Sequence, residues 1–207
     1  MGKVKQKSGF TLMELVTAIA LLSVFLVFLL KLNFSAQSAH QAVSSAIKIL
    51  ASSLDSARLR AIGDNNFTCL AIDTASTYKF RRIALYRRER DDSWAAEQVV
   101  MLPERTFIIP IGELSRYLGG RDLSPYAYAE EPLRINGEAV DCYSFIFDRQ
   151  GILCNGERNN AIIAIGYGAS RDGSVQMDSD SPLMGVLVVP AGQQVILESR
   201  AAITEAI

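Results

Sequence analysis

Histidine is nearly absent from this chain, and the usual nucleotide-binding motifs are missing. His40 is the only histidine in 207 residues, and it lies in a long segment of helical pattern rather than beside a candidate nucleophile. A histidine-based catalytic triad is therefore not expected. No glycine-rich phosphate loop of the required spacing occurs either. We expect no enzymatic activity and no cofactor, and we interpret His40 as a solvated polar position.

Cysteine is the second scarce residue type. Cys69, Cys142 and Cys154 are the only three, and none belongs to a Cys-x-x-Cys pair, so the common zinc motifs are excluded. Cys142 and Cys154 flank a turn signal at residues 148–151 and would face each other if strands pair across it. This predicts one disulfide in an oxidising compartment. Three reduced cysteines acting as small core residues are the alternative.

Charge is almost missing from residues 10–30, where Glu14 is the only ionisable side chain. A helix of about 21 residues is about 31 Å long, which matches the hydrocarbon core of a bilayer. Three lysines lie in the first seven residues with no acid before Glu14, so the positive-inside rule places the N-terminus in the cytoplasm. We predict a single inner-membrane span over residues 10–32 and a periplasmic remainder.

Glu14 is the exception within the predicted span. A carboxylate in hydrocarbon costs on the order of a few kcal/mol unless a positive charge neutralises it. The next basic residue along the chain is Lys31, several helical turns away, and the lysines before Glu14 belong at the headgroups. A positive charge from another molecule is the most economical partner, so Glu14 points to an intermolecular contact.

Residues 8–15, Ser-Gly-Phe-Thr-Leu-Met-Glu-Leu, resemble the type IV prepilin signature shared by pilins and type II secretion pseudopilins. That signature joins a short basic leader, a glycine, Phe-Thr-Leu-x-Glu and a hydrophobic run at fixed spacing. The resemblance implies that a prepilin peptidase cleaves after Gly9 and methylates the new N-terminus at Phe10. It also implies that Glu14 meets the N-terminal amine of a neighbouring subunit during filament assembly.

An ordinary secretory signal peptide is the alternative for this segment. Such peptides have an apolar stretch of about 7–15 residues and no use for a carboxylate near its start. Ala36 and Ser38 offer only a poor small-x-small cleavage site. Prepilin processing is favoured, with residues 1–9 as the leader peptide. Its removal changes the net charge from −1 to −4, which is too mild to indicate a nucleic-acid partner.

Residues 31–62 contain neither glycine nor proline. Apolar residues recur at helical spacing from Val43 to Ala61, with polar residues on the opposite side. We predict one continuous helix over residues 10–62, in which residues 33–62 form an amphipathic stalk covered by a globular domain. Gly63 is predicted to end the helix in a left-handed conformation, and no proline kink is expected.

Short β-type segments follow residue 66. The predicted strands are residues 67–72, 78–86, 98–102, 106–109, 143–147, 161–167, 185–189 and 194–197. Residues 110–138 and 171–182 are predicted to be long loops, with one short helix near residues 112–118. Tight turns between the strands favour antiparallel sheets. The predicted fold class is α+β and type IV pilin-like, with a long N-terminal helix packed on an antiparallel β-sheet domain over residues 67–207.

Three further segments resemble the H-type minor pseudopilins and T-type minor pilins, the GspH/FimT group. Residues 54–61 are similar to a Leu-x-x-Ala-Arg-x-x-Ala stretch, residues 145–151 to a strand and turn ending in glycine, and residues 187–197 to a terminal hairpin. The resemblance implies a minor pilin or pseudopilin built into a filament. The implied partners are prepilin peptidase, other pilin or pseudopilin subunits and an inner-membrane assembly platform.

Two charged segments admit other functions. Residues 78–90 combine five arginines with aromatic residues, a mixture that binds single-stranded nucleic acid, although three nearby acids largely cancel the charge. The arginines are Arg81, Arg82, Arg87, Arg88 and Arg90. A solvated hairpin is favoured, and a DNA- or surface-binding minor pilin is the alternative function.

The second charged segment is a weak candidate for calcium. Asp172, Asp178 and Asp180 supply hard oxygen ligands, but their spacing is not that of an EF-hand. A solvated polar loop is favoured there, and no bound metal is predicted.

Overall fold

The computed structural model of the chain describes residues 12–74, 80–126, 128, 132–135, 138–154, 160–171, 174–177 and 180–207, and gives only the backbone at residues 27–36, 170–171 and 174–175. The chain divides into two compact units, of which the first ends at Ser38 and the second covers Ala39–Ile207. The sheets and the hydrophobic core described below belong to the second unit.

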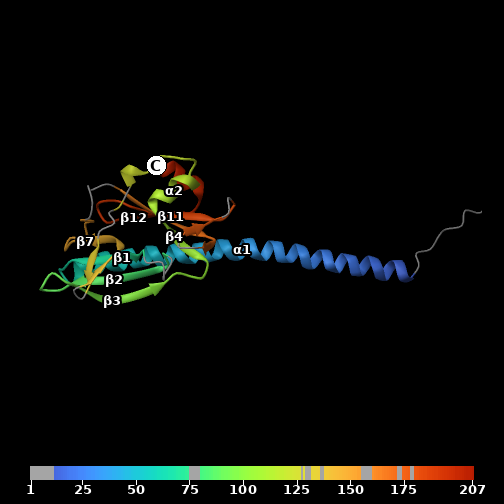
Figure 1. The fold of residues 1–207 in the computed structure, drawn as a ribbon, viewed down its shortest axis with the longest axis horizontal. Helices are drawn as coiled ribbons and strands as arrows, with labels where there is room; N and C mark the ends of the chain where they lie inside the picture. Colours follow the sequence, from blue (N-terminus) through green and yellow to red (C-terminus); the bar gives the residue numbers. More distant parts are fainter. Residues whose placement is uncertain are drawn as a thin grey trace, which may run out of the picture. The chain divides into compact units, whose positions relative to one another are not determined.

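Helix α1 spans Leu12–Gly63 (Figure 1), close to the predicted range of residues 10–62. In the second unit the predicted apolar stripe is the buried face of α1, because it packs against the sheets. Its buried residues are Val43, Ala46, Ile47, Leu50, Leu54, Ala57 and Ala61. Polar residues of the opposite side, including Gln41, Lys48 and Asp55, are exposed. This part of the helix is therefore amphipathic, as predicted.

The C-terminal end of α1 differs from the prediction in its capping residue. Gly63 is the last helical residue, and it is Asn65 that takes the left-handed conformation, with φ of 49°. The backbone N–H of Asn66 then donates to the carbonyl oxygen of Ala61 at 3.1 Å. Asparagine tolerates this conformation better than most residues, so the chain turns two residues later than the glycine suggested.

Two sheets form the body of the second unit, and their strands pair antiparallel except for the parallel contact between β3 and β5. The six-stranded sheet has the order β6-β5-β3-β2-β1-β7, and the four-stranded sheet has the order β12-β11-β8-β4. The first contains β1 (Thr68–Asp73), β2 (Arg82–Arg88), β3 (Trp94–Met101), β5 (Leu133–Ile135), β6 (Glu138–Val140) and β7 (Cys142–Phe147). The second contains β4 (Thr106–Ile109), β8 (Ala161–Tyr167), β11 (Leu183–Val188) and β12 (Gln194–Leu197). A separate pair joins β9 (Ala169–Arg171) to β10 (Ser174–Gln176).

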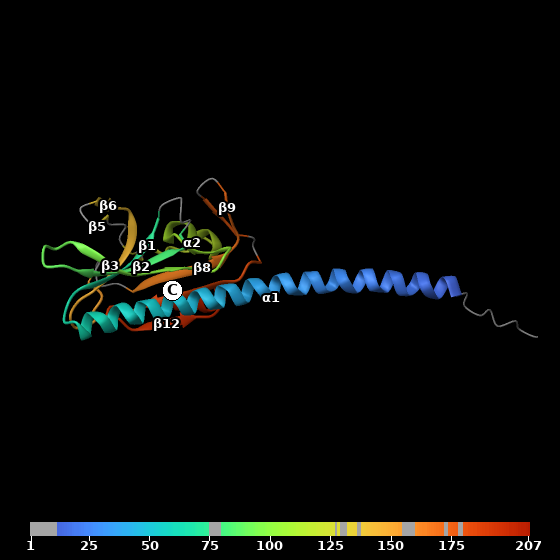
Figure 2. The same ribbon diagram turned by 90° about the horizontal axis from the view of Figure 1, so that it is seen from below.

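The main core lies between α1 and one face of both sheets, along which the C-terminal part of the helix runs (Figure 2). Leu50 and Leu54 of α1 share this core with Phe145 of β7 and Ile163 of β8. The other face of the four-stranded sheet is covered by α2 (Ile111–Tyr117) and α3 (Arg200–Ala206), through Leu114 and Ile203 among others. The fold class is therefore α+β, as predicted, with a long helix packed on antiparallel sheets.

Three structural features fall outside the predicted pattern. Helix α3 was not predicted, although Ser199 caps it by accepting a hydrogen bond from the N–H of Ala202 at 3.1 Å. Strand β5 lies in the predicted loop 110–138, and β6 begins at the last residue of that loop. Strand β10 lies in the predicted loop 171–182, and β9 ends at the first residue of that loop. Strand β2 begins at Arg82 rather than at residue 78, because Phe80 has φ of 55°, which no extended strand accommodates.

Candidate assembly site in the N-terminal helix

A mainly apolar surface, which includes Glu14, Thr17 and Ser23, covers the first turns of α1. Every residue from Leu12 to Leu26 is exposed, and the large apolar side chains among them are Leu12, Met13, Leu15, Val16, Ile19, Leu21, Leu22, Val24, Phe25 and Leu26. Water solvates such a surface poorly, and an apolar area of this extent normally marks contact with lipid or protein. This part of α1 is therefore the strongest candidate for a contact surface in the described chain.

The hydroxyl groups within this surface are satisfied by the helix itself. Thr17 Oγ1 donates to the carbonyl oxygens of Met13 at 2.9 Å and Glu14 at 3.0 Å. Ser23 Oγ donates to the carbonyl oxygen of Ile19 at 2.8 Å. Hydrogen bonds of this kind allow serine and threonine to sit in an apolar environment without water.

Glu14 lies in the first turn of α1 and is exposed. A carboxylate there is favoured by the positive end of the helix dipole. Gly9 and Phe10, the predicted cleavage and methylation positions, lie outside the described residues. Among the described residues, no helix combines the length and the apolarity required to cross a membrane. The predicted span over residues 10–32 extends into positions outside that set and stays a prediction.

The predicted disulfide between Cys142 and Cys154 is contradicted by the register of β7. No disulfide joins the two cysteines, and the N–H of Cys154 donates to the carbonyl oxygen of Ile146 at 2.7 Å. Cys142 is four residues earlier on that strand, about 13 Å away at about 3.3 Å per residue, whereas a disulfide needs Cα atoms within about 7 Å. The cysteines do flank the turn, but their register does not place them opposite each other.

The alternative of three buried, reduced thiols is correct for two of them. Cys69 and Cys142 are buried in a small core on the outer face of the six-stranded sheet, and Cys154 is exposed. Burial raises the pKa of the Cys142 thiol to about 11. Burial, and then the neighbouring Cys142, raises the pKa of Cys69 still further. The two buried thiols therefore stay protonated near neutral pH, and a protonated thiol is a poor nucleophile.

The other predicted site residues are separated in the structure or lie outside the described residues. His40 is exposed on α1. Asp180 is described, but Asp172 and Asp178 are not, so the weak calcium candidate stays untested. Among the described residues, no group of three potential metal ligands of the His, Cys, Asp and Glu types comes together.

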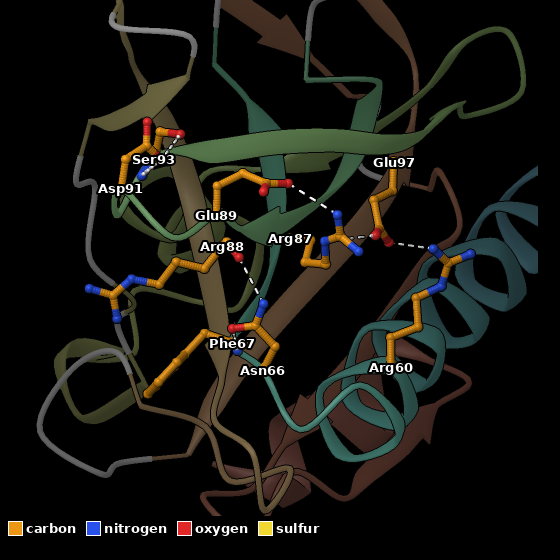
Figure 3. A network of polar contacts seen from close by, with 9 residues as sticks. All are labelled: Arg60, Asn66, Phe67, Arg87, Arg88, Glu89, Asp91, Ser93 and Glu97. Carbon is orange, nitrogen blue, oxygen red and sulfur yellow. Dashed lines mark hydrogen bonds and ion pairs between the residues drawn. The ribbon is translucent and has the colours of Figure 1, made fainter.

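The five clustered arginines do not form one basic patch. Arg82 pairs with Asp73 at 3.1 Å at one end of β2, and Arg81 donates to the carbonyl oxygen of Leu102 at 2.8 Å. At the other end, Arg87 pairs with Glu89 at 3.1 Å and Glu97 at 3.6 Å, and Arg88 pairs with Asp92 at 3.0 Å. Figure 3 shows Glu97 between Arg87 and Arg60 of α1. The predicted cancellation of charge is thus confirmed for Glu89 and Asp92, whereas Asp91 accepts hydrogen bonds from Ser93.

One arginine near this end was not singled out from the sequence. Arg149, in the turn after β7, places its guanidinium carbon 5.9 Å from the ring centroid of Phe67, and Arg88 places its own 5.1 Å from the same ring. Arg149 is far from Arg88 in the sequence, and the pairing of β1 with both β7 and β2 brings the two together. No local pattern marks this contact.

Comparison with known proteins identifies the N-terminal segment. Residues 4–30 match the family model described as the prokaryotic N-terminal methylation motif. No curated protein matches the chain. Two solved structures of the minor pseudopilin EpsH from the type II secretion system of Vibrio cholerae are similar to it, each with a TM-score of 0.44. The first structure is 11% identical, and the match covers 76% of this chain and 97% of that structure's chain. The second is 15% identical, and the match covers 77% of this chain and 95% of that structure's chain. Residues 4–30 therefore carry the prepilin-type N-terminal methylation motif that the sequence predicted.

Proposed function

We propose that this protein is a minor pilin or pseudopilin subunit. It inserts with its N-terminus in the cytoplasm, is cleaved after Gly9 by a prepilin peptidase and is methylated at Phe10. The mature subunit then assembles through its N-terminal helix into a type II secretion pseudopilus or a related type IV pilus-like filament. The observation that carries this proposal is the methylation motif over residues 4–30, which includes the exposed apolar surface of α1 from Leu12 to Leu26.

The apolar surface of α1 supports a role in assembly because it suits both environments that a filament subunit meets. Leu12 to Leu26 need lipid around them in the free subunit and other apolar helices around them in a filament. The self-satisfied hydroxyls of Thr17 and Ser23 suit both environments. The second unit buries its own core. It can therefore keep its structure while the surroundings of the helix change from lipid to other helices.

Glu14 supplies specificity in this scheme. A carboxylate near the edge of a bilayer can reach the headgroups or become protonated, so insertion tolerates it. In a dry bundle of helices the same charge costs several kcal/mol unless a cation meets it. The amine of Phe10 from a neighbouring subunit would offset much of that cost and fix the axial register of the two helices.

A DNA- or surface-binding minor pilin is less well supported. Arg82, Arg87 and Arg88 are committed to ion pairs with acids of the same unit. The neutralisation of these arginines leaves no continuous basic track of the kind that follows a phosphate backbone among the described residues. The filament-assembly role therefore stands as the proposal.

Mass spectrometry of the mature N-terminus tests the proposal directly. We expect a chain that begins at Phe10 and carries one added methyl group on its amine. Gly9→Ala should be processed better than a bulky replacement such as Gly9→Leu, because a small side chain suits the peptidase subsite. A mature chain that begins near Ala39, after the Ala36-x-Ser38 site, would show an ordinary signal peptide and overturn the proposal.

A further inference from the structure

A surface hollow of about 550 Å³ lies where the chain passes from α1 into β1. It is lined by Asn66, Phe67, Arg87, Arg88, Glu89, Arg90, Asp92 and Arg149. Its four arginines come from β2, from the turn that follows β2 and from the turn after β7. With two acids in the same lining, the hollow carries two positive charges in excess. This concentration of guanidinium groups lies outside the N-terminal methylation motif and outside the apolar surface of α1.

Phe67 orders two of these guanidinium groups. Arg88 and Arg149 both lie over its ring, at 5.1 Å and 5.9 Å from the centroid. A guanidinium that rests on an aromatic face still has its N–H edge available for a planar oxyanion. The ring therefore helps to position both guanidinium groups, of which Arg88 is already paired with Asp92 at 3.0 Å and Arg149 is not.

Hydrogen bonds hold Asn66 and Phe67, two residues that line the hollow, in place, as Figure 3 shows. Asn66 Nδ2 donates to the carbonyl oxygen of Arg88 at 2.7 Å, and Asn66 Oδ1 accepts from the N–H of Phe67 at 2.8 Å. The N–H of Arg88 donates to the carbonyl oxygen of Phe67 at 3.0 Å. The segment carrying the aromatic ring is thus joined to the strand carrying the arginines.

Arg90 and Arg149 differ from the other arginines of the lining. Arg87 and Arg88 are ion-paired with Glu89 and Asp92 respectively, whereas Arg90 and Arg149 form no ion pair within the described residues. Both are exposed. An exposed guanidinium without an internal carboxylate can pair with an incoming anion at little desolvation cost. These two residues are the available positive charges of the hollow.

We propose that this hollow binds a short acidic segment of a protein partner, whose carboxylates pair with Arg90 and Arg149. Carboxylates match the bidentate fork of arginine. A peptide with two or three acids also balances the modest excess of positive charge. Glu89 and Asp92 interrupt the basic lining that a continuous phosphate backbone would follow, and Arg88 and Arg149 already lie over the Phe67 ring on which a base would stack. These features favour an acidic peptide over a single-stranded nucleic acid.

Fluorescence anisotropy with a labelled hexaglutamate peptide tests this site, using the full chain in neutral detergent micelles at low and at physiological salt. Wild-type protein should bind the peptide, and Arg90→Ala/Arg149→Ala should weaken binding by about tenfold or more, since each charge-assisted hydrogen bond contributes substantially. The matched control is Arg116→Ala/Arg134→Ala, which removes two exposed arginines outside the hollow and makes the same change in net charge. Its affinity should stay within about twofold of wild type, because only long-range attraction is lost.

Circular dichroism melts verify that each variant is folded, and Arg90→Lys/Arg149→Lys is used if the alanine variant is not. The lysine variant keeps the positive charges but cannot form the paired N–H hydrogen bonds of a guanidinium to a carboxylate. It should therefore bind more weakly than wild type. Equal losses in the two alanine variants would show nonspecific attraction and overturn the proposal. Absence of peptide binding by wild type would do the same. Tighter binding of a labelled dT20 oligonucleotide that depends on Arg90 and Arg149 would assign the hollow to nucleic acid instead.

Discussion

Arg58 of α1 donates a hydrogen bond from Nε to the carbonyl oxygen of Gly151, at 3.2 Å. Gly192 lies against the same two residues, because a side chain placed on it would meet the Gly151 oxygen at 2.1 Å and Arg58 Nε at 2.9 Å. The three segments that resemble the GspH/FimT group, residues 54–61, 145–151 and 187–197, therefore meet at one point. The end of the helix, the turn after β7 and the terminal hairpin are joined there.

Substitution of the two turn glycines should be costly. Gly151 has φ of 75° and Gly192 has φ of 74°, a region that residues with a Cβ rarely adopt. Gly151→Ala also places its Cβ 2.7 Å from Ile62 Cδ1, and Gly192→Ala collides with a backbone oxygen that cannot move aside. We expect each to lower the free energy of unfolding by about 1–3 kcal/mol. Urea denaturation of the full chain in detergent measures the change.

Gly63→Ala is the matched control for that prediction. Gly63 is helical, and among the described residues no atom outside its chain neighbours and the nearby helix backbone lies within 4 Å of the Cβ that alanine would add. Alanine there should raise the free energy of unfolding by about 0.5–1 kcal/mol. A similar loss of stability in all three alanine variants would contradict the close-packed junction at Arg58, Gly151 and Gly192.

Replacement of Glu14 should separate insertion from assembly. Glu14→Ala and Glu14→Leu should still insert and be processed after Gly9, because neither step needs the carboxylate. Both should enter filaments poorly, since each removes the carboxylate of the proposed charge pair with the amine of Phe10 from a neighbour. Membrane fractionation, N-terminal mass analysis and cross-linking into filaments follow the three steps side by side. Wild-type incorporation of Glu14→Leu would show that apolar packing alone directs assembly.

Thiol labelling should distinguish the three cysteines. Cys154 is exposed and should react with a maleimide in the native protein, whereas buried Cys69 and Cys142 should react only after unfolding. Cys154→Ser should therefore abolish native labelling. Mass analysis under non-reducing conditions should find no bond between Cys142 and Cys154. Native protection of Cys154 together with such a bond would contradict the observed register of β7.

Alkaline pH should destabilise the fold through its buried thiols. The pKa of Cys142 is raised from 9.0 to about 11 by burial, and that of Cys69 is raised further, so both stay protonated in the folded state. Unfolded cysteines ionise near pH 9, so the unfolded state binds fewer protons above that pH. The free energy of unfolding should then fall as the pH rises from about 9 toward 11, by up to about 1.4 kcal/mol per pH unit for each thiol.

Paired variants isolate this thiol contribution. Cys69→Ala/Cys142→Ala should show a shallower decline above pH 9, although its stability at neutral pH is lower because a small cavity forms. Cys154→Ala should leave the slope unchanged, since that thiol is exposed in both states. Urea denaturation at several pH values between 8 and 11 provides the slopes. Identical slopes in wild type and the double variant would assign the alkaline decline to other groups.

Strong periodic patterns allowed much of the fold to be predicted. The helical stripe from Val43 to Ala61 proved to be the buried face of α1, and β4, β8 and β12 have the predicted bounds. Predictions were wrong where a single residue suggested a local geometry. Gly63 suggested a helix cap that Asn65 provides, because the backbone hydrogen bonds at the helix end determine which residue turns left-handed.

The N-terminal methylation motif and the apolar run within it could be identified from the sequence because both depend on the order and spacing of neighbouring residues. The charge and position of Glu14 likewise required no knowledge of the fold. Tertiary structure alone decided which distant residues meet. The junction of Arg58, Gly151 and Gly192, the separation of Cys142 from Cys154, and the contact of Arg88 and Arg149 with Phe67 all follow from strand pairing and register. Register is set by the packing of whole faces, which no short segment of sequence specifies.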